Sequence, residues 1–199
     1  DGLSLEAAGV RHGPQGIDVD AWLRTSSRHI YAAGDVIGGA QFSHLAGWQG
    51  FQAVRNALLP GATRGIPQTV PEVTFTVPEV AHIGLTEQAA RERFGARVRN
   101  GSLALGRVDR AVSEDDACGL VKLIARPDGR LLGATIMGER AGEALAEVAL
   151  ALSRRLRVAE LAAAIHPYPT YNSAIQLLAT RMAIEQRLCG SRAGVLRLL

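Results

Sequence analysis

Two apolar runs joined by a turn place the strongest constraint on what this chain can fold into. Residues 119–124 and 131–137 are rich in Leu, Val, Ile and Met, and Pro-Asp-Gly-Arg stands between them at 127–130. Tight turns favour Pro, Asp and Gly, so the pattern predicts an antiparallel β-hairpin. Two further strand-like runs precede it, at 73–77 and 98–108, and residues 81–84 continue from the first of them towards a helix. The sequence therefore predicts an antiparallel sheet in this part of the chain.

Helical periodicity surrounds these strands. Thr86 is expected to cap a helix that ends near Phe94. After the hairpin, apolar residues recur at spacings of three and four along three stretches, at about 141–155, 158–164 and 171–187. Strands followed by helices are typical of an α+β domain, in which helices flank an antiparallel sheet. We assign this domain to residues 70–190 and interpret residues 191–199 as a tail.

The first part of the chain follows a different pattern. Residues 29–33 form a short apolar run that ends in Gly34-Asp35, which is typical of a buried strand in a parallel sheet. Residues 42–59 show helical spacing and stop at Pro60-Gly61. The sequence thus predicts a strand, a Gly-Asp turn and a helix in this order.

A segment without apolar periodicity separates these two patterns. Residues 61–70 hold two glycines and a proline and no sustained apolar run. We interpret the segment as a linker, so the first domain is expected to comprise residues 1–65.

Charge and composition exclude several classes of protein. The 22 basic and 19 acidic residues give a net charge of +3, which is too small to indicate a nucleic-acid-binding protein. No apolar run reaches eighteen residues, so no transmembrane helix is expected, and residues 1–5 do not resemble a signal peptide. Cys118 and Cys189 lie far apart and form neither a disulfide framework nor a metal site. The expectation is a soluble, cytoplasmic α/β chain without a membrane partner.

The Gly34-Asp35 turn carries the first chemical signal. A carboxylate at the carboxyl edge of a parallel sheet lies at the usual ligand crevice and can accept hydrogen bonds from sugar-like hydroxyls. The helix that begins near Phe42 would present free N–H groups to an anion or a carbonyl. The alternative is that Asp35 only caps a turn.

Several segments, in order, resemble the pyridine nucleotide–disulfide oxidoreductases. Residues 30–36, Ile-Tyr-Ala-Ala-Gly-Asp-Val, resemble the second flavin-binding motif of that family, and residues 74–87 resemble the opening of its C-terminal dimerisation domain. Residues 166–170, His-Pro-Tyr-Pro-Thr, fall where the family carries its active-site loop. Three shorter matches lie between them, at 119–123, 132–134 and 141–143. The resemblance extends over about residues 2–187.

This resemblance implies a fold and a set of cofactor contacts. The chain would contain the C-terminal end of a Rossmann-like FAD domain, followed by an α+β dimerisation domain that forms a homodimer. Asp35, next to the flexible Gly34, would bind the ribityl chain of FAD. The backbone around His44, Leu45 and Ala46 would face the pyrimidine edge of the flavin, and the His44 side chain is expected to be structural.

The two aromatic residues of the same predicted helix are expected to be core residues rather than flavin contacts. Trp48 and Phe51 lie at an ordinary helical spacing, which is typical of a buried face.

The loop at 166–170 departs from the pattern of reductases that act on lipoamide or glutathione. At the positions that resemble Tyr168 and Ser173 of this chain, those enzymes carry a histidine and a glutamate. A phenol titrates near ~10 and is a poor general base at neutral pH. A tyrosine here is similar to the mercuric reductases, in which it faces the metal–thiolate site of the partner subunit. We predict that Tyr168 and His166 face substrate, the alternative being that the loop only leads into a helix capped by Thr170.

Parts of the family's machinery are absent from this sequence. It contains no Gly-x-Gly-x-x-Gly loop and no two cysteines at four-residue spacing, and Cys189 stands alone where mercuric reductases end in a cysteine pair. The chain therefore resembles the C-terminal part of a longer enzyme, in which electrons pass from NAD(P)H through FAD and a cysteine pair to a metal-ion or small-molecule disulfide substrate. Two alternatives remain: a dihydrolipoyl dehydrogenase-like reductase and a non-catalytic dimerisation module.

Overall fold

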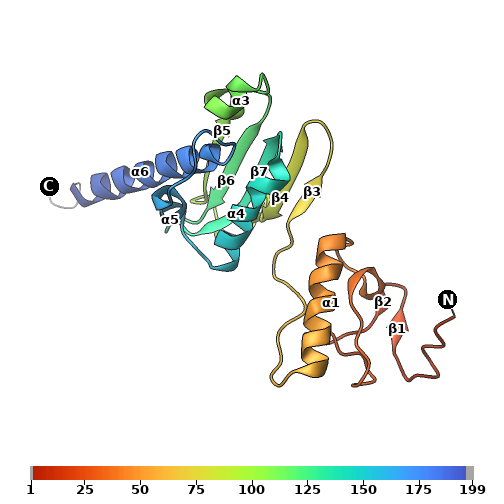
Figure 1. Cartoon of the computed structure of the whole chain (residues 1–199). Coiled ribbons are helices and arrows are strands. Elements are labelled where there is room, and N and C mark those ends of the chain that lie inside the picture. The colour runs from red at the N-terminus through yellow and green to blue at the C-terminus, as the bar shows by residue number, and fades with distance from the viewer. Residues whose placement is uncertain (1, 196–199) are drawn as a thin grey trace. The chain divides into compact units, whose positions relative to one another are not determined.

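The computed structural model describes residues 2–195, with side chains as far as residue 188. The chain forms two compact units, residues 1–70 and residues 71–199 (Figure 1).

The first unit is built around one helix. Strands β1 (His12–Gly13) and β2 (Gly16–Ile17) form a small hairpin, a 3-10 turn η1 follows at Gly34–Ile37, and helix α1 extends over Ser43–Leu58. The prediction of a helix at 42–59 is confirmed.

The predicted strand at 29–33 is wrong. Only Tyr31 makes a sheet-like contact, an isolated antiparallel bridge to Arg24. The segment folds back on the preceding residues instead, because the N–H of Thr25 donates to Ile30 O and that of Ala32 to Leu23 O. A strand needs a neighbour to complete its hydrogen bonds, and no described segment supplies a parallel one.

Polar contacts tie the end of the first unit to α1. The buried Asn56 side chain donates to Trp22 O at 3.0 Å and to Thr63 O at 2.8 Å, and accepts from Thr63 N at 2.8 Å. The N–H of Gly65 donates to Ala21 O at 2.8 Å. The first half of the segment interpreted as a linker is therefore packed against this unit.

Two aromatic residues of α1 do not lie in the core. Trp48 is 40% exposed and Phe51 is 67% exposed, so the expectation that they are core residues is wrong. The buried face of α1 is formed by Leu45, Gln49, Ala53 and Asn56.

The second unit contains a five-stranded antiparallel sheet. The strands are β3 (Glu72–Thr74), β4 (Glu79–Gly84), β5 (Arg99–Ala104), β6 (Leu120–Ala125) and β7 (Leu131–Gly138), in the spatial order β3-β4-β7-β6-β5. Strands β6 and β7 pair as the predicted hairpin, and the α+β architecture is confirmed. The strand expected at 98–108 ends at Ala104 and is followed by a 3-10 turn, η2 (Leu105–Arg107), and helix α3 (Asp109–Ser113).

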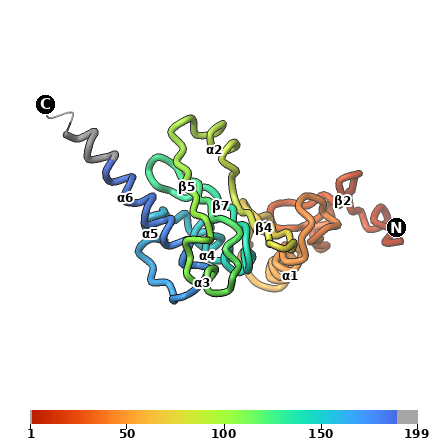
Figure 2. Tube along the Cα trace, turned by 90° about the horizontal axis from the view of Figure 1, so that it is seen from above, coloured from red at the N-terminus to blue at the C-terminus, as the bar shows by residue number. Residues whose placement is uncertain are grey.

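Helices cover both faces of this sheet. Helix α4 (Ala141–Ser153) packs on β4 and β7, α6 (Ser173–Val195) packs on β5 and β6, and α5 (Val158–Ala163) packs against α6 (Figure 1). Helix α2 (Glu87–Phe94) lies on the other side of the strands from α4 (Figure 2). Its N-cap is Thr86, as predicted, whose hydroxyl accepts from Ala89 N at 3.2 Å.

The main core lies between the sheet and helices α4, α5 and α6. Its fully buried members include Leu123, Ile136, Leu145, Val148, Ile175 and Leu178. This layer supports the loop between α5 and α6, which carries His166 and Tyr168. Among the described residues, no helix is long and apolar enough to cross a membrane.

The C-terminal end differs from the prediction. Helix α6 continues to Val195, into the segment interpreted as a tail. Residues 196–199 lie outside the described residues, and so does the side chain of Cys189.

Candidate functional site

The Gly34-Asp35 turn lies against the first turn of α1. Gly34 has φ +78°, and its N–H donates to the buried Gln49 Oε1 at 2.8 Å. A Cβ at Gly34 would lie only 2.9 Å from Ala46 Cβ. Glycine is therefore required both by the backbone conformation and by this close approach. The contact brings the exposed Asp35 close to the start of α1.

The start of α1 leaves backbone donors without a side-chain cap. Its N-cap is Phe42, whose side chain accepts no hydrogen bond. Leu45 is buried, whereas His44 is exposed and its ring stacks on that of Phe42, with centroids 5.2 Å apart. The first N–H groups of a helix carry partial positive charge. The predicted cofactor-binding residues of the first unit thus lie together: the Asp35 carboxylate beside the first turn of α1, in which the N–H of Ala46 donates to Phe42 O at 2.9 Å.

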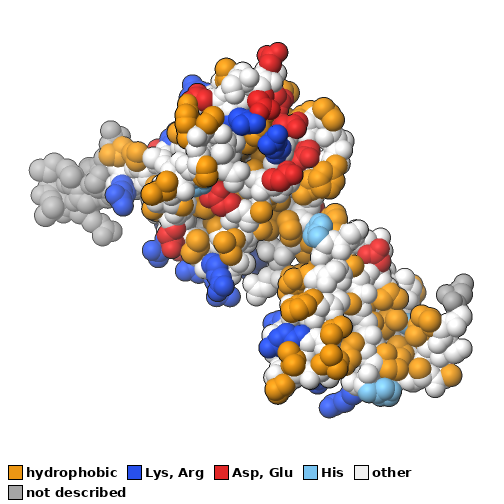
Figure 3. Space-filling model, in the orientation of Figure 1, with side chains coloured by type: hydrophobic (Ala, Val, Ile, Leu, Met, Phe, Trp, Pro, Cys, Tyr) orange, Lys and Arg blue, Asp and Glu red, His pale blue; other side chains and the backbone are white. Residues whose placement is uncertain are grey.

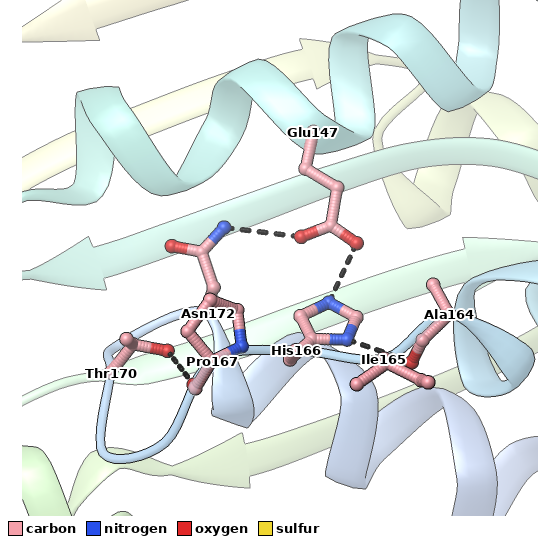
Figure 4. A pocket seen from close by; sticks show the side chains of 7 residues that line it. All are labelled: Glu147, Ala164, Ile165, His166, Pro167, Thr170 and Asn172. Carbon is pink, nitrogen blue, oxygen red and sulfur yellow. Dashed lines mark hydrogen bonds and ion pairs between the residues drawn. The ribbon is translucent and has the colours of Figure 1, made fainter.

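In the second unit, the loop between α5 and α6 is anchored through His166. The imidazole is 6% exposed, with Nε2 2.7 Å from Glu147 Oε1 on α4 and Nδ1 3.1 Å from Ala164 O (Figure 4). A carbonyl oxygen can only accept, so Nδ1 carries a proton in this arrangement. Because both ring nitrogens are engaged, the geometry favours an anchoring function for His166 over direct contact with substrate.

Glu147 connects the two ends of this loop. While one carboxylate oxygen contacts His166, the other accepts from Asn172 Nδ2 at 3.1 Å (Figure 4). These side chains, with Ile165, Pro167 and Thr170, line a pocket of about 350 Å³. The segment that carries Tyr168 is therefore held at both its ends by one carboxylate.

Tyr168 projects from the middle of the loop and is 74% exposed. Its hydroxyl donates to Asp109 Oδ2 on α3 at 2.5 Å. This hydrogen bond to a carboxylate raises the pKa of Tyr168 above its ordinary value. An even smaller fraction of this phenol than of a free tyrosine is therefore ionised at neutral pH, so little phenolate is available to act as a general base.

Sequence reasoning missed three residues of this site. Glu147 left one signal, since it interrupts the apolar face of α4 between Leu145 and Val148. Asp109 gave none, because it lies 59 positions from Tyr168 in the sequence. Asn172 belongs to the loop itself, but no local pattern relates it to Glu147, 25 positions away. No group of three or more His, Cys, Asp or Glu within the described part of the chain could hold a metal ion.

Comparisons with known proteins find a family model for the second unit and relatives that extend over both units. Residues 70–179 match the dimerisation domain of the pyridine nucleotide-disulphide oxidoreductases. A mercuric reductase from Streptomyces lividans is 41% identical over 182 residues, which cover 90% of this chain and 38% of that protein. A dihydrolipoyl dehydrogenase from Thermus scotoductus is 37% identical over 177 residues, covering 88% of this chain and 38% of that protein.

Solved structures share the fold. The structure of LpdA from Mycobacterium tuberculosis matches with a TM-score of 0.83 and 32% identity, over 92% of this chain and 40% of that one. The chain thus spans about two fifths of the length of these relatives.

Proposed function

Because this chain belongs to the pyridine nucleotide–disulphide oxidoreductase family, we propose that it is the C-terminal part of an NAD(P)H-dependent flavoprotein reductase of the mercuric reductase type. The observation that carries the proposal is Tyr168, exposed on an anchored loop where a general base would be needed for dithiol chemistry. The 41% identity to a mercuric reductase supports it.

The first unit would supply part of the FAD site. The Asp35 carboxylate would accept hydrogen bonds from the ribityl hydroxyls, and the N–H groups at the start of α1 would face the electron-rich pyrimidine edge of the flavin. When bound, FAD supplies a two-electron path from NAD(P)H to a cysteine pair carried elsewhere in the full-length enzyme. The Asp35 carboxylate and the N–H groups at the start of α1 are thus of the kinds that would suit bound FAD.

The properties of Tyr168 favour a metal-ion substrate. Oxidation of a dithiol to a disulfide releases two protons and needs a base to accept them. Reduction of Hg(II) to Hg(0) consumes two electrons and no proton, with NAD(P)H giving NAD(P)⁺ and H⁺. A phenol that keeps its proton and donates it in a hydrogen bond to Asp109 suits the second reaction, in which it would contact the metal–thiolate complex.

The substitution Tyr168→Phe tests this assignment in the full-length enzyme. We expect kcat/KM for a Hg(II)–thiolate complex to fall at least about tenfold, while flavin content stays unchanged, because one contact of the reacting complex is lost. NAD(P)H oxidation measures the rate, and the control is Tyr171→Phe, which removes the hydroxyl of a buried tyrosine from the same segment. A protein without flavin, or mercury reduction that survives Tyr168→Phe intact, would contradict the proposal. Turnover of lipoamide alone would favour the dihydrolipoyl dehydrogenase alternative.

The FAD assignment has its own test in Gly34→Ala. The new methyl group would meet Ala46 Cβ at 2.9 Å, so we expect η1 to move away from α1 and flavin occupancy to fall. Gly39→Ala is a matched control, since Gly39 also has positive φ, +79°, but nothing lies within 4 Å of the added Cβ. The ratio of flavin to protein absorbance gives the occupancy. Equal flavin content in both variants would refute the assignment.

A further inference from the structure

We propose that Asp109 is a positioning residue for Tyr168 that makes this face of the loop selective for cationic substrates. The inference rests on the proposed function, because it assumes that Tyr168 faces the substrate. It adds the charge class of that substrate and a residue that determines it.

The first step is the orientation of the Tyr168 hydroxyl. Its O–H donates to Asp109 Oδ2 at 2.5 Å, although the two residues are separated by 59 positions in the sequence. Both side chains are exposed, so the hydrogen bond is made at the surface where substrate would arrive. With its proton directed at Asp109, the phenol has no donor left for an anionic ligand and presents only oxygen lone pairs.

The second step is the charge around this pair. Between residues 107 and 116, four carboxylates stand against two arginines; the pairing of Arg110 with Glu114 leaves three carboxylates and one arginine. Acidic side chains gather over α3 and the neighbouring strand ends, with basic groups among them (Figure 3). Tyr171 responds to the same carboxylates, because burial first, and then Asp116 and Glu114, raise its pKa. Two tyrosines of one segment are thus in a negative field.

The third step is the consequence for substrate. A metal–thiolate complex or a disulfide with positively charged arms would be attracted to the Tyr168 face, whereas one with carboxylate arms would be repelled. The loop cannot move away from this field easily, because Glu147 holds it through His166 and Asn172.

A series of substrates that differ only in the charge of their thiol ligands tests the inference in the full-length enzyme. Hg(II) is offered as its complex with cysteamine, 2-mercaptoethanol or 3-mercaptopropionate, which differ in net charge and share the same metal and two sulfur ligands. We expect kcat/KM to decrease in that order. The difference should lie in KM rather than kcat and should shrink as salt is added.

Variants at Asp109 give the decisive comparison. We expect Asp109→Asn to lower the cationic-to-anionic ratio of kcat/KM about fivefold, and Asp109→Glu to restore most of it. Glu92→Gln, which removes one charge from an exposed position on α2, should leave the ratio unchanged. Ultraviolet titration should show that Tyr168 ionises at lower pH in Asp109→Asn, with Tyr168→Phe as the reference that identifies its signal.

The outcomes separate this inference from the proposed function. If all three mercury complexes turn over and Asp109→Asn leaves their ratio unchanged, the inference is wrong and the proposed function stands. If mercury is not reduced, the disulfides of the same three thiols replace it as substrates. If kcat/KM did not depend on the charge of these disulfides, the inference would be overturned. A cationic-to-anionic ratio of kcat/KM that falls in Asp109→Asn would support it. A protein that turns over neither series would overturn both.

Discussion

At the scale of single residues, Glu147 has more effect on the site than its position on a partly exposed helix suggests. One of its carboxylate oxygens lies 2.7 Å from His166 Nε2 and the other accepts from Asn172 Nδ2 at 3.1 Å, so it closes the loop that carries Tyr168. The His166 ring is almost fully buried. Removing the carboxylate would leave a buried polar ring without this partner, which is costlier than losing an exposed hydrogen bond.

The substitution Glu147→Ala is therefore expected to cost about 1–3 kcal/mol in the free energy of unfolding. Urea denaturation measures that loss, and hydrogen exchange should show weaker protection at residues 170–176. Glu143→Ala, at an exposed position on the same helix, should change neither. If both variants behaved alike, Glu147 would not be the anchor of the loop.

At the scale of elements, α2 is attached to the sheet by both packing and charge. Its Ala90 lies in a small core with Val98 and Ile124. Glu87 in its first turn accepts from Lys122 Nζ on β6 at 2.6 Å, and also from Arg91. The hydrogen bond from Lys122, followed by that from Arg91, lowers the pKa of Glu87 to about 2.

The lowered pKa of Glu87 predicts a pH dependence of stability. Since the folded-state pKa, about 2, lies below the ordinary value of 4.5, the ionised group stabilises the fold fully above pH 4.5. The contribution is lost as the pH falls towards 2. The stability difference between the unmodified chain and Glu87→Gln should therefore be present at neutral pH and vanish in acid, as measured by urea denaturation. Glu92→Gln should show no such trend, and a pH-independent difference for Glu87→Gln would contradict the prediction.

At the scale of the whole molecule, the second unit exposes apolar side chains that a monomer would be expected to bury. Val77 is 98% exposed and Ile165 is 97% exposed. Others on this unit include Phe75, Leu150, Leu177 and Ile184. Exposed apolar surface of this kind marks interaction sites. The match to a dimerisation domain supports the expectation, drawn from the family resemblance of the sequence, that this unit forms a homodimer.

Ile165→Asp is expected to weaken that dimer at least about tenfold, because a charge would be buried against apolar surface. Sedimentation velocity over a range of concentrations measures the dissociation constant. Leu3→Asp, at a position in the first unit that is 73% exposed, is the control. A chain that sediments as a monomer at all concentrations would contradict the homodimer proposal.

The sequence by itself determined the elements whose signals are local. The helix at Ser43–Leu58, the Thr86 cap and the hairpin of β6 and β7 follow from apolar spacing, capping and turn chemistry within a few residues. The ordered motifs also pointed to the family and to Asp35 and Tyr168 as site residues. All these inferences depend on residues that are close together in the chain.

The tertiary structure alone decided the features that depend on distant partners. The apolar run at 29–33 resembles a strand, yet it forms only one bridge, because β structure needs hydrogen bonds from a neighbouring segment. Asp109 reaches Tyr168 across 59 residues, and Glu147 reaches His166 across 19. Such pairs are set by the packing of α3, α4 and the loop around a common core, and no local pattern encodes that packing.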